Sequence, residues 1–82
     1  QCTGLKDKNG KEIYKGDILQ TDFNDIAFGV CNSWVEFQDA AFIVKEPGYE
    51  NSYMTLNELM TLSPEVIGNT YENKDLLEVP NE

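Results

Sequence analysis

The chain has 82 residues, a length that supports one small domain with a single core. Its fifteen acidic residues outnumber six lysines, which gives a net charge of -9 at pH 7, and neither histidine nor arginine occurs in the sequence. The composition, with 40% hydrophobic and 26% charged residues, excludes a disordered chain, and the acidic balance argues against direct binding of DNA or RNA, which depends on cations.

The first twenty residues predict a β-hairpin followed by a strand. An Asn-Gly dipeptide at positions 9 and 10 is the pair that best accommodates the two positive φ angles of a two-residue type I′ turn. A second turn is expected at residues 15–17, and residues 18–20 then predict a strand that enters the core. The residues of this region expected in the core are Leu5, Ile13, Tyr14 and Ile18.

A meander is predicted in the middle of the chain. Its three short strands are expected over residues 28–32, 34–37 and 41–45. The turns between them are expected at residues 32–33 and 38–39. Proline cannot donate to a strand ladder, so Pro47 ends the meander and residues 46–52 are expected to form a loop.

The last third of the chain predicts two helical turns and one strand. Thr55 and Glu58 have the spacing of a capping box, so a short helix is expected between Thr55 and Pro64. Residues 65–71 predict a strand in which Gly68 indicates a bulge or a tight bend. A final helical turn is expected over residues 73–77.

These elements predict an all-β fold with minor α content, made of five or six short strands and one or two helical turns. So few short strands bury one face only by curling into a small barrel or a strongly bent sheet. In the barrel, Phe28, Phe37 and Phe42 would fill the interior. The whole chain, residues 1–82, is expected to be one domain.

Two stretches near the ends of the chain resemble the motifs of the YopX family of phage and prophage proteins. The first comprises residues 3–14 and 16–18, and the second comprises residues 66–69, 71–73 and 76–77. The resemblance implies a β-rich, barrel-like, self-associating domain in the cytoplasm of a bacterial host, and it implies no catalytic residue. Typical family members carry a further N-terminal segment, so the chain is expected to be the C-terminal part of a longer protein.

Aromatic and basic residues provide two candidate binding surfaces. Trp34, Tyr49 and Tyr53 lie in or beside the meander and its acidic loop, and such rings anchor interfaces, so an aromatic contact surface is expected there. Residues 1–15 hold four lysines and two acids, a net charge of +2, whereas residues 16–82 hold two lysines and thirteen acids, a net charge of -11. The second candidate is therefore a basic hairpin that carries Lys6, Lys8, Lys11 and Lys15.

No catalytic, metal-binding or cofactor-binding residue is predicted. Cys31 is a nucleophile, but nothing in the sequence activates it without a histidine. Asp22, Asn24 and Asp25 offer oxygen ligands in a calcium-like pattern, yet the glycine and the glutamate of such a loop are missing, so a solvated loop is expected. Cys2 and Cys31 form a disulfide only if the fold brings their α-carbons within about 7 Å, which the sequence leaves open. No apolar run is long enough to cross a membrane.

The leading functional hypothesis is a non-enzymatic phage interaction protein that binds itself and a phage or host protein. One alternative is an inhibitor whose acidic surface mimics nucleic acid and occupies a host defence or repair protein, marked by exposed acids about 6 to 7 Å apart on one face. A further alternative is an oligomeric trap for a small ligand, with a pocket between subunits lined by Tyr49, Tyr53 or Trp34 and by a lysine of the basic hairpin.

Overall fold

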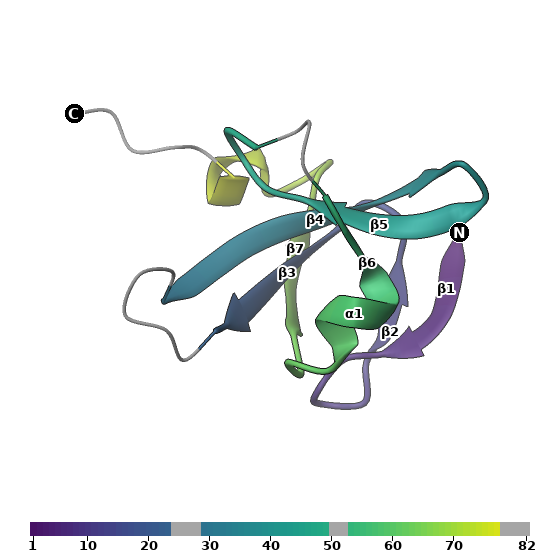
Figure 1. Ribbon diagram of the computed structural model, residues 1–82. Coiled ribbons are helices and arrows are strands. Elements are labelled where there is room, and N and C mark those ends of the chain that lie inside the picture. The colour runs from purple at the N-terminus through teal and green to yellow at the C-terminus, as the bar shows by residue number, and fades with distance from the viewer. Residues whose placement is uncertain (24–28, 50–52, 78–82) are drawn as a thin grey trace.

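The computed structural model describes residues 1–23, 29–49 and 53–77. The strands of these residues are β1 (Cys2–Lys6), β2 (Glu12–Tyr14), β3 (Asp17–Asp22), β4 (Val30–Gln38), β5 (Ala41–Lys45), β6 (Met54–Thr55) and β7 (Glu65–Asn69). They form a five-stranded sheet in the order β6-β5-β4-β3-β7 and a two-stranded sheet of β1 and β2, and every pairing is antiparallel (Figure 1). The described helices are the α-helix α1 (Leu56–Met60) and the 3-10 helix η1 (Lys74–Leu77).

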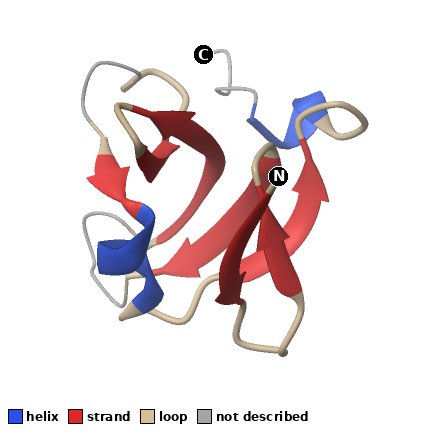
Figure 2. Ribbon diagram, turned by 90° about the vertical axis from the view of Figure 1, so that its right-hand side faces the viewer, coloured by secondary structure: helices blue, strands red, loops and turns tan. Residues whose placement is uncertain are grey.

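The predicted all-β class with minor α content is confirmed, and the two helical turns lie where they were expected. The larger sheet is bent but not closed, because its edge strands β6 and β7 do not pair with each other (Figure 2). The strongly bent sheet is therefore the correct description, and the closed barrel is not formed by the described strands. The β6 strand was not predicted, because two residues are too few to show an alternating pattern.

The predicted N-terminal hairpin is confirmed, but its turn differs from the expected one. The N–H of Gly10 donates to the carbonyl of Asp7 at 3.0 Å, and Gly10 has a φ of +83° whereas Asn9 does not have a positive φ. A type I′ turn needs positive φ at both central residues, so this prediction was wrong. The Asp7 carboxylate explains the longer turn, since it accepts the N–H groups of Asn9 and Lys11.

The predicted meander is partly confirmed. The expected turn at residues 32–33 was wrong, because β4 runs unbroken through it and Ser33 is buried within the strand. Asn32 is accommodated there because its amide donates to a backbone carbonyl of η1 at 3.0 Å. The turn between β4 and β5 lies at Asp39 and Ala40, whose φ angles of +52° and +63° are those of a type I′ turn.

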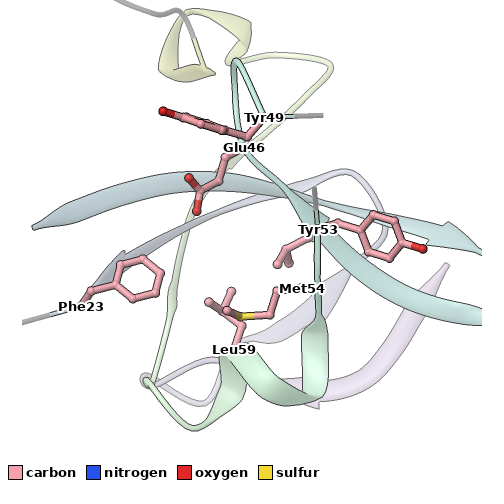
Figure 3. A pocket seen from close by; sticks show the side chains of 7 residues that line it. Phe23, Glu46, Tyr49, Tyr53, Met54 and Leu59 are labelled. Atoms are coloured by element: carbon pink, nitrogen blue, oxygen red, sulfur yellow. The ribbon is translucent and has the colours of Figure 1, made fainter. Parts of the chain in front are cut away.

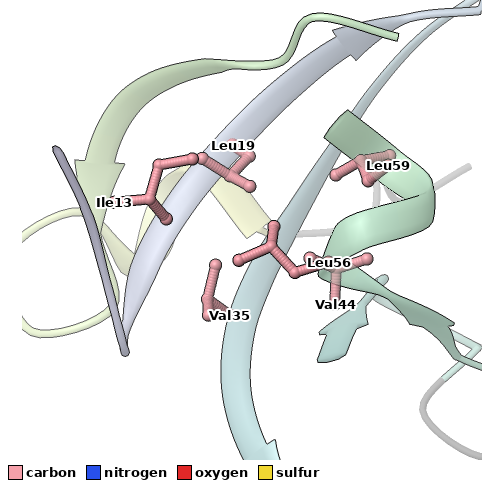
Figure 4. Packing of buried hydrophobic residues seen from close by; sticks show 6 residues of the cluster. All are labelled: Ile13, Leu19, Val35, Val44, Leu56 and Leu59. Carbon is pink, nitrogen blue, oxygen red and sulfur yellow. The ribbon is translucent and has the colours of Figure 1, made fainter. Parts of the chain in front are cut away.

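The main core lies between one face of the larger sheet, the β1–β2 hairpin and α1, where side chains from all three converge (Figure 4). Alternation along β3 and β5 places Ile18 and Ile43 on the opposite face, and both are also buried. The larger sheet therefore buries apolar residues on both faces. The residues of the main cluster are Ile13, Leu19, Val35, Val44, Leu56 and Leu59.

The core predictions for the aromatic residues were mostly wrong. Tyr14 is 44% exposed because it alternates with the buried Ile13 on β2. Phe37 is also 44% exposed, and it packs edge-on against the half-buried Phe42 with ring centroids 4.9 Å apart. Phe28 lies outside the described residues. The open sheet explains this result, since it has no closed interior for large rings to fill.

The carboxylate of Asp7 joins the hairpin to the far end of the chain. One of its oxygens accepts the two N–H groups of its own turn, and the other accepts the N–H of Val66 in β7 at 2.9 Å. Burial raises the pKa of the Asp7 carboxyl, but these three donors outweigh burial and hold the pKa below its ordinary value. The neighbouring N–H of Lys8 also donates to the carbonyl of Pro64 at 3.0 Å.

A second contact between the ends of the chain lies at the β3–β7 pairing. Ile18 is opposite Gly68 and Leu19 is opposite Val66, so β7 contains the bulge that Gly68 predicted. A Cβ atom at Gly68 would lie 2.5 Å from the amide oxygen of Asn73, which accepts the N–H of Asn69. Glycine at position 68 is therefore required by this close approach.

We expect Asp7→Asn to lower the free energy of unfolding at pH 7 by about 2 kcal/mol, because one acceptor of a buried, charge-assisted hydrogen bond becomes a donor. The folded-state pKa of Asp7 is depressed, so its stabilisation is complete above the unfolded-state pKa of about 4 and is lost as the pH falls through the folded-state value. Urea denaturation between pH 7 and pH 2 should therefore show the difference between wild type and variant shrinking below about pH 4. A difference that stays constant with pH would contradict this role.

We expect Gly68→Ala to lower the free energy of unfolding by about 1 to 3 kcal/mol, because the new methyl group displaces the Asn73 side chain. The matched experiment repeats the substitution in an Asn73→Gly background, where the displaced atoms are absent. There the cost of Gly68→Ala should largely disappear in a double-mutant cycle measured by urea denaturation. An equal cost in both backgrounds would show that the close approach is not the reason for the glycine.

Candidate functional site

An apolar pocket opens where β5 and β6 meet α1 and the end of β3 (Figure 3). Its volume is about 270 Å³. Two of the three aromatic residues expected in a contact surface, Tyr49 and Tyr53, lie in its wall. The lining residues are Phe23, Val44, Glu46, Tyr49, Tyr53, Met54 and Leu59.

Local turn chemistry positions Tyr49 at this pocket. The N–H of Tyr49 donates to the carbonyl of Glu46 at 3.0 Å and closes a four-residue turn directly after β5. Pro47 supplies the fixed φ of the second position, and Gly48 supplies the positive φ of +84° at the third, as in a type II turn. The turn leaves the Tyr49 side chain 67% exposed.

The short strand β6 positions the other side of the pocket. Met54 pairs with Val44 of β5, and both residues line the pocket together with Leu59 of α1. Tyr53 precedes Met54 and is 49% exposed. Figure 3 shows the Tyr49 ring beside Glu46, whereas the Tyr53 ring points away from Phe23, Glu46 and Leu59.

Glu46 introduces a negative charge into this apolar site. Its side chain points into the space bordered by Phe23 and Leu59 (Figure 3). Burial raises the pKa of the Cys31 thiol, and the charge of Glu46 raises that pKa further. In the described part of the chain the ion pairs are Lys8 with Glu65 and Lys45 with Glu36, so Glu46 has no lysine partner there.

Trp34 lies apart from the two tyrosines, so the structure does not bring the three predicted aromatic residues into one surface. Trp34 is half-buried on the sheet face opposite the main core, where its cross-strand neighbour is Lys45. Its indole N–H donates to Glu36 at 2.6 Å, and Lys45 lies 3.3 Å from the same carboxylate. The Trp34 hydrogen bond lowers the pKa of Glu36, burial opposes this effect, and Lys45 lowers the pKa further.

The four lysines of the predicted basic hairpin are all exposed, but they have different surroundings. Lys8 is 3.6 Å from Glu65, whereas Lys15 lines a second concavity of about 430 Å³ together with Trp34, Glu36 and Tyr71. This concavity lies within one chain and combines a hairpin lysine with Trp34, whereas the ligand-trap hypothesis placed its pocket between subunits. The remaining two lysines of the set, Lys6 and Lys11, lie at the ends of the hairpin loop.

The described residues contain no group of three histidine, cysteine, aspartate or glutamate side chains that is suited to a metal ion. Asn24 and Asp25 of the calcium-like segment lie outside these residues. Cys2 and Cys31 are not joined by a disulfide. None of the described helices is both long enough and apolar enough to cross a bilayer.

The pocket was not predicted from the sequence, because the residues of its floor are apolar and look like ordinary core residues. Val44 lies in a predicted strand and Leu59 in the predicted helix, but β6 with Met54 was not predicted, and only the pairing of β5 with β6 brings the three residues together. A turn was predicted at Glu46-Pro47-Gly48, but the sequence did not indicate that the Glu46 carboxylate faces the pocket.

The family model described as YopX protein matches residues 1–78 of the chain. Both sequence motifs that carried the resemblance lie inside the matched region. No curated protein matches the chain significantly.

We expect Glu46→Gln to accelerate alkylation of Cys31 by iodoacetamide at pH 8. Removing the negative charge lowers the pKa of Cys31, and the thiolate is the reactive form. Peptide mass spectrometry of timed reactions measures both cysteines at once, and the exposed Cys2 provides the internal control. An unchanged alkylation rate at Cys31 would show that the Glu46 charge does not affect the pKa of the Cys31 thiol.

Proposed function

This chain belongs to the YopX family, and we propose that it is a non-enzymatic interaction module that binds a partner protein through the pocket at Tyr49 and Tyr53. The proposal includes a phage or prophage origin, action in the cytoplasm of the bacterial host and association between copies of the chain. The observation that carries it is the combination of two strongly exposed tyrosines with an open apolar pocket.

Exposed aromatic rings beside an apolar cavity are typical of interfaces. Tyrosine supplies a large contact area at a low cost in side-chain entropy, and its hydroxyl remains satisfied by water or by a partner. Contiguous apolar surface on a soluble domain marks an interaction site. A domain of this size also buries a smaller fraction of the surface of its unfolded chain than a larger domain does, so covering the pocket adds to the stability of the fold.

The composition of the pocket supports binding over catalysis. The described lining supplies one carboxylate, Glu46, and two phenols, and the sequence has no histidine, the usual general base near neutral pH. The volume of about 270 Å³ also falls below the roughly 300 to 1,000 Å³ of small-molecule sites. A single side chain of a partner protein fits this size better than a cofactor does.

The two alternative functions have less support. Nucleic-acid mimicry called for a row of acids on one face, and within each described strand no two acids occupy successive positions on the same face. The ligand trap called for a pocket between subunits that contains a hairpin lysine, and the concavity at Lys15 and Trp34 within one chain also contains the Glu36 carboxylate, which opposes an anionic ligand.

We expect Tyr49→Ser to reduce capture of the partner protein by about tenfold or more. A tyrosine that becomes buried when a partner binds is a common hot spot of interfaces. Immobilised chain is incubated with lysate of a bacterial host, and the retained proteins are quantified by mass spectrometry. The matched control is Tyr71→Ser, which removes an even more exposed tyrosine that lies outside the pocket. Equal capture by wild type and both variants would contradict the proposed site.

A further inference from the structure

We propose that the pocket receives a lysine or arginine side chain from the partner protein, with its cationic head at Glu46 and its methylene stem on the apolar floor. This inference rests on the proposed function and names the chemistry of the partner segment. It commits to a basic segment of another protein as the occupant.

The floor of the pocket is suited to a methylene stem. Val44 and Leu59 are buried members of the main core, so their positions are fixed by packing on the side away from the opening. Met54 is half-buried beside them and adapts its shape easily, as an unbranched thioether side chain does. Lysine and arginine place their stems along apolar surface while their charged heads remain at a polar group.

The carboxylate of Glu46 specifies the charge of the occupant. The lysine next to it in the chain, Lys45, points to the opposite face of β5 because side chains alternate along a strand. There Lys45 is paired with Glu36 at 3.3 Å. The nearest lysine in sequence is therefore committed elsewhere, and the Glu46 charge is available to a cation from outside.

The other classes of occupant fit less well. A purely aliphatic side chain would cover the Glu46 carboxylate without providing a hydrogen-bond donor, and burying an unpaired charge is costly. An acidic side chain would be repelled by Glu46. The net charge of -9 further favours a basic partner, because it attracts cationic segments over distances comparable to the Debye length.

The test uses n-butylammonium as a probe for the lysine side chain, with n-butanol and butyrate as neutral and anionic controls. Each compound is titrated into the chain with 13C-labelled methyl groups, and NMR shifts of Val44, Met54 and Leu59 are followed. We expect butylammonium to bind about two to five times more tightly than butanol, which is the gain that a partly exposed ion pair contributes, and butyrate to cause no shift.

Two variants test whether the preference for butylammonium over butanol depends on the charge of Glu46. Glu46→Gln should abolish the advantage of butylammonium over butanol while butanol binding remains. Asp39→Asn is the matched control, because it removes the same charge at the opposite end of β5, in a turn whose positive φ asparagine tolerates. The advantage of butylammonium should survive this change.

The outcomes separate this inference from the proposed function. Equal affinities of butylammonium and butanol in the wild type overturn the cation preference, and Tyr49-dependent capture of a partner then still supports the interaction module. Self-association that Glu46→Gln abolishes, measured by light scattering, would assign the pocket to a lysine of a second copy and overturn the assignment to another protein. A charge preference that persists in Glu46→Gln would overturn the role of Glu46.

Discussion

The arrangement of this chain depends on the hydrogen bonds that the Asp7 carboxylate accepts. Three backbone N–H groups converge on it, two from its own turn and one from Val66 near the other end of the sequence. Neither edge of the larger sheet closes onto the other, so the hairpin has to be held over the core by contacts of this kind. With the hairpin in place, Ile13 reaches the main core. The two YopX motifs therefore serve one structural purpose, because they supply both partners of this contact.

The open sheet also explains where a binding site is available. Apolar side chains occupy both faces, and the hairpin and α1 cover one face. Beside α1, the turn after β5 and the short strand β6 frame an apolar pocket, and the one carboxylate of its described lining, Glu46, faces inward. The excess of acids in the sequence and a pocket carboxylate that has no lysine partner among the described residues both support the proposed basic partner.

Several features of this protein follow from interactions between residues close in sequence, and these were predictable. The capping box of Thr55 and Glu58 starts α1 as expected, since both of its hydrogen bonds connect residues three apart. The Pro47-Gly48 turn and the hairpin of the first fourteen residues were also predictable, because proline and glycine restrict or permit particular φ angles wherever they occur. The family was recognisable from the sequence because its motifs are short runs of neighbouring residues.

Other features were settled by partners distant in the chain, and no local pattern contained them. The 32–33 segment has the composition of a turn, yet it continues as a strand because Asn32 bonds to η1, more than forty residues away. The longer turn of the hairpin has a local cause, since the Asp7 carboxylate accepts the N–H groups of Asn9 and Lys11, but the sequence did not indicate that the same carboxylate also binds Val66. Trp34 and Tyr49 were grouped by their proximity in sequence, but the alternation of strands assigns them to different surroundings. Propensity acts on a few neighbouring residues, whereas burial and long-range hydrogen bonds act on the assembled sheet and outweigh it.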